Sequence, residues 1–574
     1  MTDPITTKDI EPPSAIDRTI HANMARLTCG ISPASLMQAW SDWVTHLAMS
    51  PAKQVRLMGK TARKNARLMN FVRSAVIDPN TPPAIEPLPQ DNRFKEDAWK
   101  LWPFNLYAQT FLLQQQWWHN ATTDIEGVSQ HHEDVVAFVA RQLLDTVSPV
   151  NFALTNPLVQ EATRKEFGMN LLRGWQNYLE DAQHAVSGKP PVGVEQFRPG
   201  HEVAITPGKV VYRNHLIELI QYTPSTPKVH AEPLLIVPAW IMKYYILDLS
   251  PNNSLVKYLI DQGHTVFMIS WHNPDQSDHN LGMDDYLQLG VLDALKTIRK
   301  IIPDRKIDTL GYCLGGTLLA IAAAWLAREP DPMIHSVTLL AAQTDFTEAG
   351  ELMLFIDDSQ LSYLDDMMWE KGYLDTKQMA GAFQMLRSND LIWSPLVQQY
   401  MLGKRAPMTD LMAWNADATR MPYRMHSSYL RSLFLNNELF EGRYEIAGRK
   451  IALGDIAVPL FVVATENDHV APWRSVHKIK LAVDAPVTFL LTSGGHNAGI
   501  VSEPGHAHRH YCYDTSKYQD PDSWAQAVER HEGSWWPILT AWLAAQSGPE
   551  VKARAVGAVQ HALCDAPGKY VKEI

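Results

Sequence analysis

The sequence predicts an α/β fold, in which helices cover both faces of a largely parallel sheet, preceded by a mostly helical N-terminal domain. Two observations indicate this fold. From about residue 200 onward, short unbroken apolar runs alternate with helical stretches, as is typical of a parallel sheet buried on both faces. Before that point, long amphipathic patterns dominate and strand signals are few. The length of 574 residues allows roughly two to four domains.

The chain divides into four segments. Residues 1–20 are rich in Pro and Thr and are expected to form a disordered tail, and residues 21–195 form the helical domain. A linker rich in Gly and Pro, residues 184–200, leads into the α/β domain of residues 200–574. Its expected strands are the runs KVVYR, IELIQY, PLLIVPAW, TVFMIS, IDTLGY, SVTLLAA, PLFVVAT and VTFLLTSG.

One insertion interrupts the alternation of strands and helices. Between about residues 346 and 454 the sequence is helical and loop-like, with no run that matches a core strand. An insertion of this size between two core strands is typical of a cap over an active site. We therefore expect a helical lid.

Charge, apolar runs and cysteines argue against several functional classes. The net charge of −11 disfavours a nucleic-acid partner, which clustered Lys and Arg would bind. The N-terminus lacks the basic and apolar regions of a signal peptide, and the run LLAIAAAWLA is too short to span a membrane. The scattered cysteines show no metal or disulfide spacing, so we expect free thiols in a cytoplasmic protein: Cys29, Cys313, Cys512 and Cys564.

The stretch GYCLGG has the pattern of a nucleophile elbow with sulfur in place of oxygen. A strand-like run ends before Cys313 and a helix-like run follows it, while Gly311 and Gly315 let the two approach closely. A thiol at a helix N-terminus is favoured as its anion by the helix dipole. The sequence therefore predicts Cys313 as a catalytic nucleophile.

Two further residues complete a candidate triad. Asp468 comes just after the run PLFVVA, and His496 comes just after the run VTFLL. The chain order Cys313, Asp468, His496 is the order of nucleophile, acid and histidine in α/β-hydrolases. Each residue follows the end of an expected core strand, so we expect the three side chains to meet at one edge of the sheet.

Each of these residues also has a plainer interpretation. Cys313 would then be a buried structural cysteine, Asp468 a turn former and His496 an ordinary surface histidine. Asp345 competes as the acid, although capping the entry to the lid is its more ordinary role. The stretch HAHRH has no carboxylate or thiolate beside it, so we expect a polar loop rather than a metal site at His506, His508 and His510.

A sulfur nucleophile suits acyl transfer. A thiolate exchanges readily with a thioester because the bonds broken and formed are alike, and the acyl group stays activated. The backbone N–H of Leu314 would stabilise the oxyanion, with a second N–H from Ala239 or Trp240 after the run PLLIVP. This arrangement favours an acyl-CoA donor and an alcohol acceptor, provided that water is excluded.

At these residues the sequence resembles the polyhydroxyalkanoate synthases of the single-subunit type, which are bacterial polyester polymerases. With the helical N-terminal region, the resemblance covers nearly the whole chain. It departs from the family at Ala239 and Met242, where proline and asparagine are expected, and at His272, where arginine is frequent. The matching stretches are PLLIVPAWIMKYYILDL, SWHNPD, GYCLGGTLLA, WNADATRMP, ENDHVAPWRS and LTSGGHNAGIVSEPG.

The resemblance implies an enzyme that polymerises (R)-3-hydroxyacyl-CoA into poly(3-hydroxyalkanoate) and releases CoA. Cys313 would hold the growing chain as a thioester and His496 would deprotonate the thiol. Asp468 would orient His496, and either of these two residues would activate the incoming 3-hydroxyl. The resemblance also implies a homodimer that acts at the surface of cytoplasmic polyester granules, with no metal or organic cofactor.

Two other functions remain open at the level of sequence. A thioesterase or polyester depolymerase of the same fold would send water to the acyl-cysteine. A granule-coating protein would carry the triad without using it.

Overall fold

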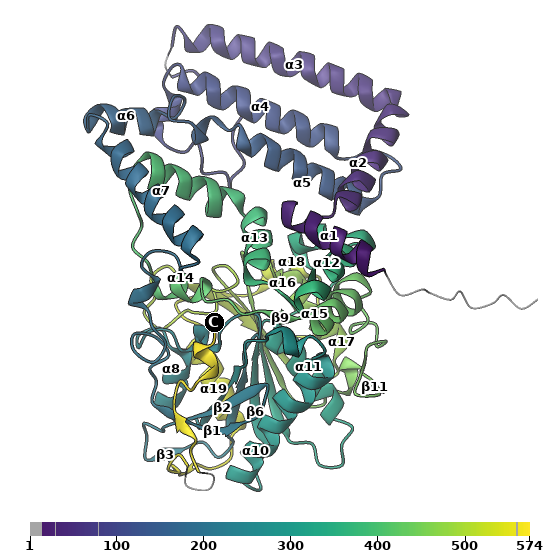
Figure 1. Ribbon diagram of the computed structural model, residues 1–574, viewed down its shortest axis with the longest axis vertical. Coiled ribbons are helices and arrows are strands. Elements are labelled where there is room, and N and C mark those ends of the chain that lie inside the picture. The colour runs from purple at the N-terminus through teal and green to yellow at the C-terminus, as the bar shows by residue number, and fades with distance from the viewer. Residues whose placement is uncertain (1–13, 29, 79, 558–560) are drawn as a thin grey trace, which may run out of the picture.

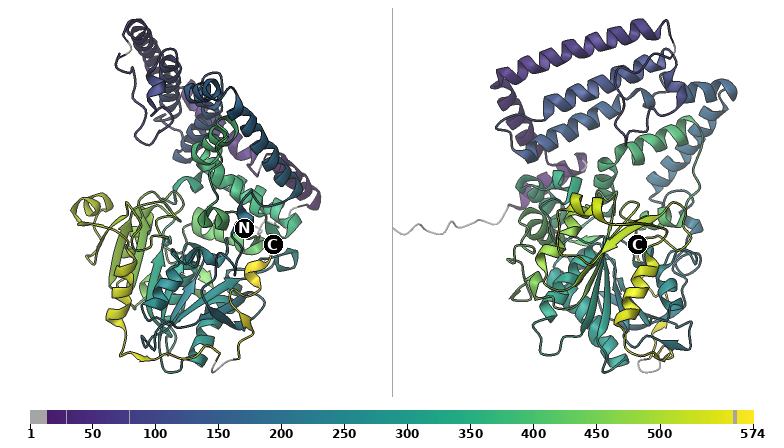
Figure 2. Two further views of the ribbon diagram at one scale, coloured as in Figure 1. Left: turned by 90° about the vertical axis from the view of Figure 1, so that its left-hand side faces the viewer. Right: turned by 180° about the vertical axis from the view of Figure 1, so that it is seen from behind.

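The computed structural model describes residues 14–574, apart from residues 29, 79 and 558–560. A helical N-terminal domain stands above an α/β domain, and the helices of an insertion lie between them (Figures 1 and 2). Helices α3, α4 and α5 form the layer farthest from the sheet (Figure 1). The helices of the N-terminal domain are α1 (Ala15–Leu27), α2 (Pro33–Ala48), α3 (Pro51–Ala75), α4 (Phe104–Thr122), α5 (Gln130–Thr146), α6 (Pro157–Lys165) and α7 (Met169–Ser187).

The predicted disordered tail, residues 1–20, extends too far into the chain. Helix α1 begins at Ala15, and the side chain of Ser14 caps its N-terminus. The guanidinium of Arg18 lies 5.1 Å from the centre of the Trp369 ring in the insertion. This long-range contact helps to hold the start of α1, and local composition gives no sign of it. The rest of the predicted tail lies outside the described residues.

The α/β domain is built on one mixed sheet with the strand order β15-β14-β13-β12-β7-β6-β4-β5-β2-β1-β17. The segment from β13 to β5 in this order is parallel, and the strands outside it pair antiparallel. All eight predicted runs form strands: β1 (Gly208–Arg213), β2 (Ile217–Tyr222), β4 (Leu234–Val237), β5 (Val266–Trp271), β6 (Ile307–Tyr312), β7 (Ile334–Leu340), β12 (Leu460–Thr465) and β13 (Val487–Thr492).

The edge strands are the part of the sheet that the apolar pattern did not predict. Strand β14 (His510–Asp514) is half-buried throughout, and β15 (Arg530–Glu532) and β17 (Cys564–Asp565) are short and mostly polar. His510, expected in a polar loop, is therefore the first residue of a strand. Pairing with Glu532 of β15 places it there, and such pairing leaves little mark on the sequence.

Helices cover both faces of the sheet, as predicted. On one face, α10 (Asp293–Ile301) and α11 (Leu314–Leu326) bury their apolar residues against the central strands. On the other face, α8 (Leu255–Asp261) and α19 (Trp536–Gln546) do the same. Nearly all residues of α11 are buried, which explains why its sequence is apolar on all sides.

A helical lid fills the interval between β7 and β12, where the insertion was predicted. Figure 2 shows these helices stacked between the sheet and the N-terminal domain. The lid includes α12 (Asp358–Lys371), α13 (Thr376–Leu386), the π-helical turns η8 (Asn389–Trp393), η9 (Leu396–Met401) and η10 (Leu430–Leu435), α14 (Asp410–Asn415) and α15 (Tyr423–Tyr429).

The start of the N-terminal domain forms hydrogen bonds with the beginning of α12 in the lid. The side-chain amide of Gln360, at the beginning of α12, donates to the carbonyl of Gly30 at 2.7 Å and accepts from the N–H of Ser32 at 2.8 Å. The hydroxyl of Ser35 donates to the carboxylate of Asp357 at 2.5 Å. Because the Gln360 amide is buried, losing either partner would leave a buried polar group unsatisfied.

Helix α7 forms hydrogen bonds with a second part of the lid, at the end of η9. The amide of Asn170 donates to the carbonyl of Met401 at 2.8 Å, and the amide of Asn177 donates to the carbonyl of Gln399 at 3.0 Å. Between them, Gly174 lets the backbones touch, since a Cβ at this position would lie 1.8 Å from the carbonyl oxygen of Tyr400. The N-terminal domain thus holds the lid at two separate places.

We expect Gly174→Ala to separate α7 from η9. The new methyl group would clash with the backbone of Tyr400, which cannot move aside as a flexible side chain can. The free energy of unfolding should therefore fall by about 1–3 kcal/mol or more. Chemical denaturation measures this loss, and limited proteolysis should cut within residues 389–405 sooner than in the parent protein. The control is Gly59→Ala in α3, where only the end of the Arg63 side chain lies nearby and the helix should gain stability. Equal stability of the two variants would contradict the close contact.

Candidate active site

Cys313 sits at a strained bend between β6 and α11. Its φ is 52° and its ψ is −124°, a backbone conformation that residues other than glycine rarely adopt. Its N–H donates to the carbonyl of Leu340 at the end of β7, at 2.9 Å. Strain of this kind persists where the surrounding structure imposes it, and it is frequent at catalytic residues.

Close backbone packing imposes the bend. A Cβ on Gly311 would lie 2.4 Å from the Cα of Gly316, and a Cβ on Gly315 would lie 2.2 Å from the carbonyl oxygen of Val237. Strand, bend and helix therefore fit together only because these positions lack a side chain. This agrees with the prediction that the small residues allow the close approach of β6 and α11.

Asp468 and His496 lie past the ends of β12 and β13 and bind each other. Nδ1 of His496 lies 2.7 Å from Oδ2 of Asp468, whose side chain is fully buried. The other oxygen of Asp468 accepts the N–H groups of Val470 and Ala471, both at 2.8 Å. These bonds hold the carboxylate in one position, and the carboxylate orients the imidazole.

The charges of the site are mutually dependent. Burial lowers the pKa of His496, but the negative charges of Asp468 and Cys313 and hydrogen bonding to both raise it well above its usual value. Burial raises the pKa of Asp468, and His496 with the two backbone N–H groups brings it below its usual value. The structure thus brings the three residues together and favours a positively charged imidazole between two acidic groups.

Tyr312 and Asn497, which the sequence did not single out, support the imidazole. The centre of the Tyr312 ring lies 5.7 Å from that of His496, and its hydroxyl donates to Oδ1 of Asn497 at 2.6 Å. Each residue adjoins a triad member in the chain, and adjacency is the one sequence signal that could have indicated them.

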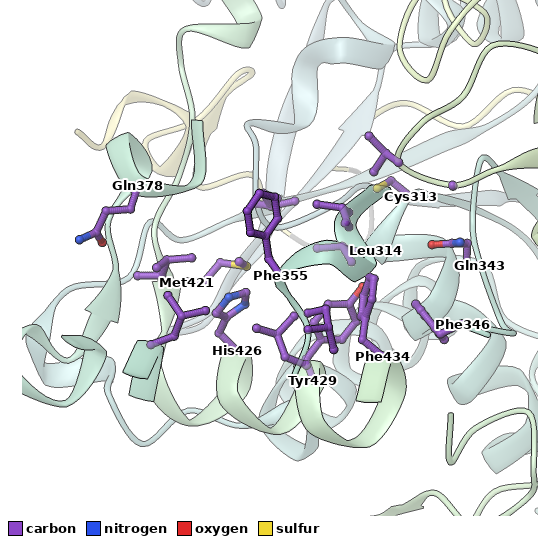
Figure 3. A pocket seen from close by; sticks show the side chains of 18 of the residues that line it. Cys313, Leu314, Gln343, Phe346, Phe355, Gln378, Met421, His426, Tyr429 and Phe434 are labelled. Atoms are coloured by element: carbon purple, nitrogen blue, oxygen red, sulfur yellow. The ribbon is translucent and has the colours of Figure 1, made fainter. Parts of the chain in front are cut away.

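A cavity of about 180 Å³ extends from Cys313 beneath the lid. Figure 3 shows Cys313, Leu314 and Gln343 at one end and Gln378 at the other. Gly30 and Ile31 of the N-terminal domain also line the cavity. Its walls are mostly apolar, and the lid supplies the aromatic side chains Phe346, Phe355, Tyr429 and Phe434. The cavity can therefore take an apolar group attached to the sulfur.

The residues proposed to stabilise the oxyanion differ in whether they line the cavity. Leu314 lines the cavity beside Cys313. Ala239 and Trp240 are buried in the core, and the carbonyl of Trp240 accepts the hydroxyl of Thr419. Ile241, the next residue of the same loop, is the one that lines the cavity.

The competing residues have other partners. The carboxylate of Asp345 accepts the N–H of Thr347 at 2.8 Å and caps the turn that enters the lid. His469, the histidine next to Asp468 in the chain, is exposed at the surface. His506 and His510 bind different carboxylates, at 2.8 Å and 2.9 Å, in keeping with polar surface groups.

The cysteine elbow, the acid and the histidine at the ends of parallel strands define an enzyme of the α/β-hydrolase fold. A family model described as "alpha/beta hydrolase fold" matches residues 232–501. Models described as "Poly-beta-hydroxybutyrate polymerase (PhaC) N-terminus" and "Poly-beta-hydroxybutyrate polymerase N terminal" match residues 90–259 and 11–53. A monoacylglycerol lipase structure from Paleococcus ferrophilus aligns with 58% of this chain and 99% of its own, at 12% identity and a TM-score of 0.31.

Poly(3-hydroxyalkanoate) polymerases are similar in sequence to this chain over most of its length. A poly(3-hydroxyalkanoate) polymerase of Methylorubrum extorquens is 40% identical over 91% of this chain and 87% of its own. Polymerase subunits PhaC of Rhizobium meliloti and Cupriavidus necator are 38% and 35% identical over 84% of this chain and 79% and 83% of their own. The chain belongs to the poly(3-hydroxyalkanoate) polymerase family and is an enzyme of the transferase class.

We expect Asp468→Asn to reduce the reactivity of Cys313 at mildly acidic pH. Without the charge of Asp468, the pKa of His496 falls because burial disfavours the charged ring and one of the groups that raise this pKa is gone, so the imidazole becomes a weaker base for the thiol. The rate at which iodoacetamide alkylates Cys313 at pH 6 should fall about tenfold or more, measured by mass spectrometry of the peptide that contains it.

The matched control is Asp345→Asn, which alters the competing acid and leaves the Asp468–His496 pair intact. Its alkylation rate should follow that of the parent protein across pH 5–8. A drop in the Asp345 variant with no change in the Asp468 variant would reverse the assignment of the acid.

Proposed function

We propose that this protein polymerises (R)-3-hydroxyacyl-CoA into poly(3-hydroxyalkanoate) and releases CoA, with Cys313 as the nucleophile. Family membership supports the reaction class. The observation that carries the catalytic assignment is the sulfur of Cys313 at the strained bend, beside His496 and open to an apolar cavity.

The first step transfers the acyl group to the enzyme. The sulfur of Cys313 attacks the thioester carbonyl, and the imidazole of His496 takes the thiol proton. Backbone N–H groups of Leu314 and of the loop 239–241 would stabilise the oxyanion. As the carbon–sulfur bond to CoA breaks, His496 returns the proton to the departing thiolate of CoA.

The second step extends the polyester. The 3-hydroxyl of an incoming (R)-3-hydroxyacyl unit attacks the thioester carbonyl of the acyl group bound to Cys313. An ester bond forms, and the sulfur of Cys313 leaves as the thiolate. We assign His496 as the base for this hydroxyl. Asp468 is a poor candidate because backbone N–H groups and His496 already bind its oxygens and keep its pKa low.

Exclusion of water separates this reaction from hydrolysis. The lid and the residues of the N-terminal domain at the cavity wall surround the acyl group with apolar side chains. Water in such a site would find few hydrogen-bonding partners, whereas a hydroxyl tethered to the substrate arrives with its acyl chain. A thioesterase would need an ordered path for water to reach the same carbonyl.

Exposed apolar side chains along α7 support the proposal that the enzyme acts at a polymer surface. Within the described residues, no helix is long and apolar enough to cross a bilayer. Large apolar side chains nevertheless remain exposed along this helix, and a contiguous patch of this kind is typical of an interaction surface. We propose that it contacts the polyester granule, and that the enzyme works as a homodimer there. The exposed residues are Met169, Leu171, Leu172, Trp175, Tyr178, Leu179 and Val186.

Purified protein supplied with (R)-3-hydroxybutyryl-CoA should release CoA and form insoluble polymer. Cys313→Ala should abolish both products, because the nucleophile is gone. The matched control is Cys512→Ser, a partly buried free thiol on β14, which should keep the parent activity. Free CoA is measured with a thiol reagent, and polymer by turbidity and by depolymerisation to monomers.

The two rival functions give different results in the same assay. Soluble 3-hydroxybutyrate in equal amount to CoA, without polymer, would identify a thioesterase. Full CoA release by Cys313→Ala would mean that the triad is not used. Turnover across acyl chains of increasing length then tests whether the aromatic walls of the cavity select the substrate.

A further inference from the structure

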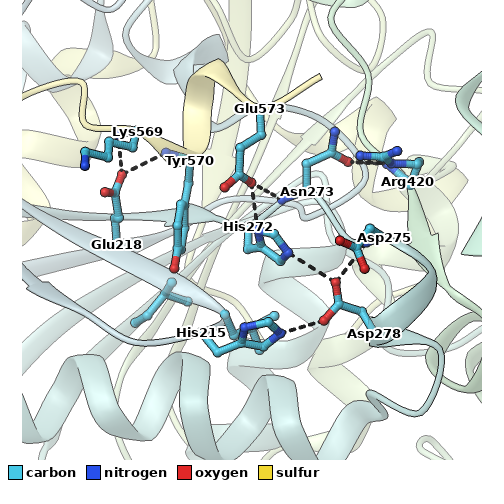
Figure 4. Close-up of polar contacts among 12 residues, drawn as sticks. His215, Glu218, His272, Asn273, Asp275, Asp278, Arg420, Lys569, Tyr570 and Glu573 are labelled. Carbon is cyan, nitrogen blue, oxygen red and sulfur yellow. Dashed lines mark hydrogen bonds and ion pairs between the residues drawn. The ribbon is translucent and has the colours of Figure 1, made fainter.

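A second cluster of potential ligands lies just past the carboxyl end of β5, and none of its residues lines the cavity at Cys313. Nε2 of His215 lies 2.5 Å from one oxygen of Asp278, and Nε2 of His272 lies 3.1 Å from the other. The ligand atoms of all three residues lie within 4.8 Å of one another. His215 is in the turn between β1 and β2, and the other two flank the loop that follows β5 (Figure 4).

We propose that His215, His272 and Asp278 bind a divalent transition metal, with Zn²⁺ as the ion that this set fits best. Two imidazole nitrogens and one carboxylate oxygen are ordinary zinc ligands, with metal–ligand distances of about 2.0–2.2 Å. The three donors lie within 4.8 Å of one another, so small side-chain rotations that break the hydrogen bonds to Asp278 would open a space for the ion between them. The metal takes the place of the protons shared between the imidazoles and the carboxylate.

The surroundings have the form of a second ligand shell. Nδ1 of His272 lies 2.7 Å from a carboxylate oxygen of Glu573, an arrangement that fixes the ring and leaves Nε2 for the metal. The N–H of Asp275 donates to the carboxylate of Asp278 at 2.8 Å and holds it in place. Figure 4 shows Glu573 and Asp278 on opposite sides of the His272 ring.

Charge and access also favour a cation. The carboxylates of Asp278 and Glu573 flank the His272 ring, so two negatively charged groups lie beside the proposed site. The carboxylate of Asp278 is buried, which limits competition from water. The side chain of His215 is 58% exposed and opens the site to solvent, through which an ion can enter.

His272 occupies a position at which arginine is frequent in the family that the sequence resembles. A guanidinium there could form ion pairs with the same two carboxylates but could not bind a metal. The inference is therefore specific to chains that have histidine at this position together with His215. It is independent of the polymerase mechanism, since none of these residues lines the cavity at Cys313.

Metal binding would fasten the C-terminal end of the chain to the base of the lid. The N–H of Asn273 donates to Glu573 at 2.8 Å, and Oδ1 of Asn273 accepts the N–H of Arg420 at 3.0 Å, next to Met421 in the cavity wall. The side chain of Arg420 reaches the backbone carbonyl of Ile574 at 3.0 Å. An ion on His272 would hold this network in one arrangement.

The test is a Zn²⁺ titration of the full chain after treatment with EDTA, in competition with a chromogenic chelator. The parent protein should bind one equivalent of Zn²⁺ that His215→Gln and His272→Arg do not bind. His272→Arg keeps a cation between the two carboxylates, and His215→Gln changes an exposed side chain, so both should fold. The control is His279→Gln, an exposed histidine of the same loop, which should keep this equivalent.

Two further measurements separate a built site from adventitious binding. Glu573→Gln should weaken Zn²⁺ binding by about 10–100-fold, as expected for a residue that orients a ligand. Zn²⁺ should also slow removal of the C-terminal residues by a carboxypeptidase in the parent protein and not in His215→Gln. Equal zinc stoichiometry in the parent and both ligand variants, or no binding by the parent, would overturn the proposal.

Discussion

The bend at Cys313 is the constraint on which the rest of the site depends. A positive φ at a residue with a side chain is unfavourable, and backbone contacts at Gly311 and Gly315 keep it in place. The bend starts α11 at the next residue and leaves the thiol beside an imidazole that follows β13, three strands of the main sheet farther along the chain. Without it, the thiol of Cys313 would not line the cavity.

The N-terminal domain acts on this site through the lid. It contributes Gly30 and Ile31 to the cavity and binds the lid near Gln360 and again along α7. On α7, side-chain amides bind carbonyls of the lid backbone, whereas at Gln360 a side-chain amide of the lid binds the backbone of the N-terminal domain. The position of the lid, and with it the exclusion of water, therefore depends on a domain far from the sheet.

The sequence was most informative where local pattern and tertiary role coincide. The central strands are long apolar runs, and the triad residues follow such runs directly, so both could be predicted from one chain. Strands β14, β15 and β17 are defined by backbone pairing at the edge of the sheet, which needs no apolar pattern. The start of α1 depends on contacts such as Arg18 on Trp369, which are distant in sequence.

The site itself shows the same division. Asp468 and His496 meet as expected from strand order, and Ile241 of the loop after β4 lines the cavity, a residue that the motif did not single out. The direction of a loop residue depends on how the loop packs, and motif spacing does not encode it. The aromatic walls of the cavity come from lid helices whose residue types resemble those of any buried helix.

The lid also determines how long the sulfur survives. An accessible thiolate is the starting point for oxidation to sulfenic acid and, irreversibly, to sulfinic acid, and access decides the rate as much as charge does. Cys313 is only partly exposed, beneath helices that the N-terminal domain holds in place. The lid thus also shields the resting thiol from peroxide, so the resistance of Cys313 to oxidation should follow the stability of the two lid anchors.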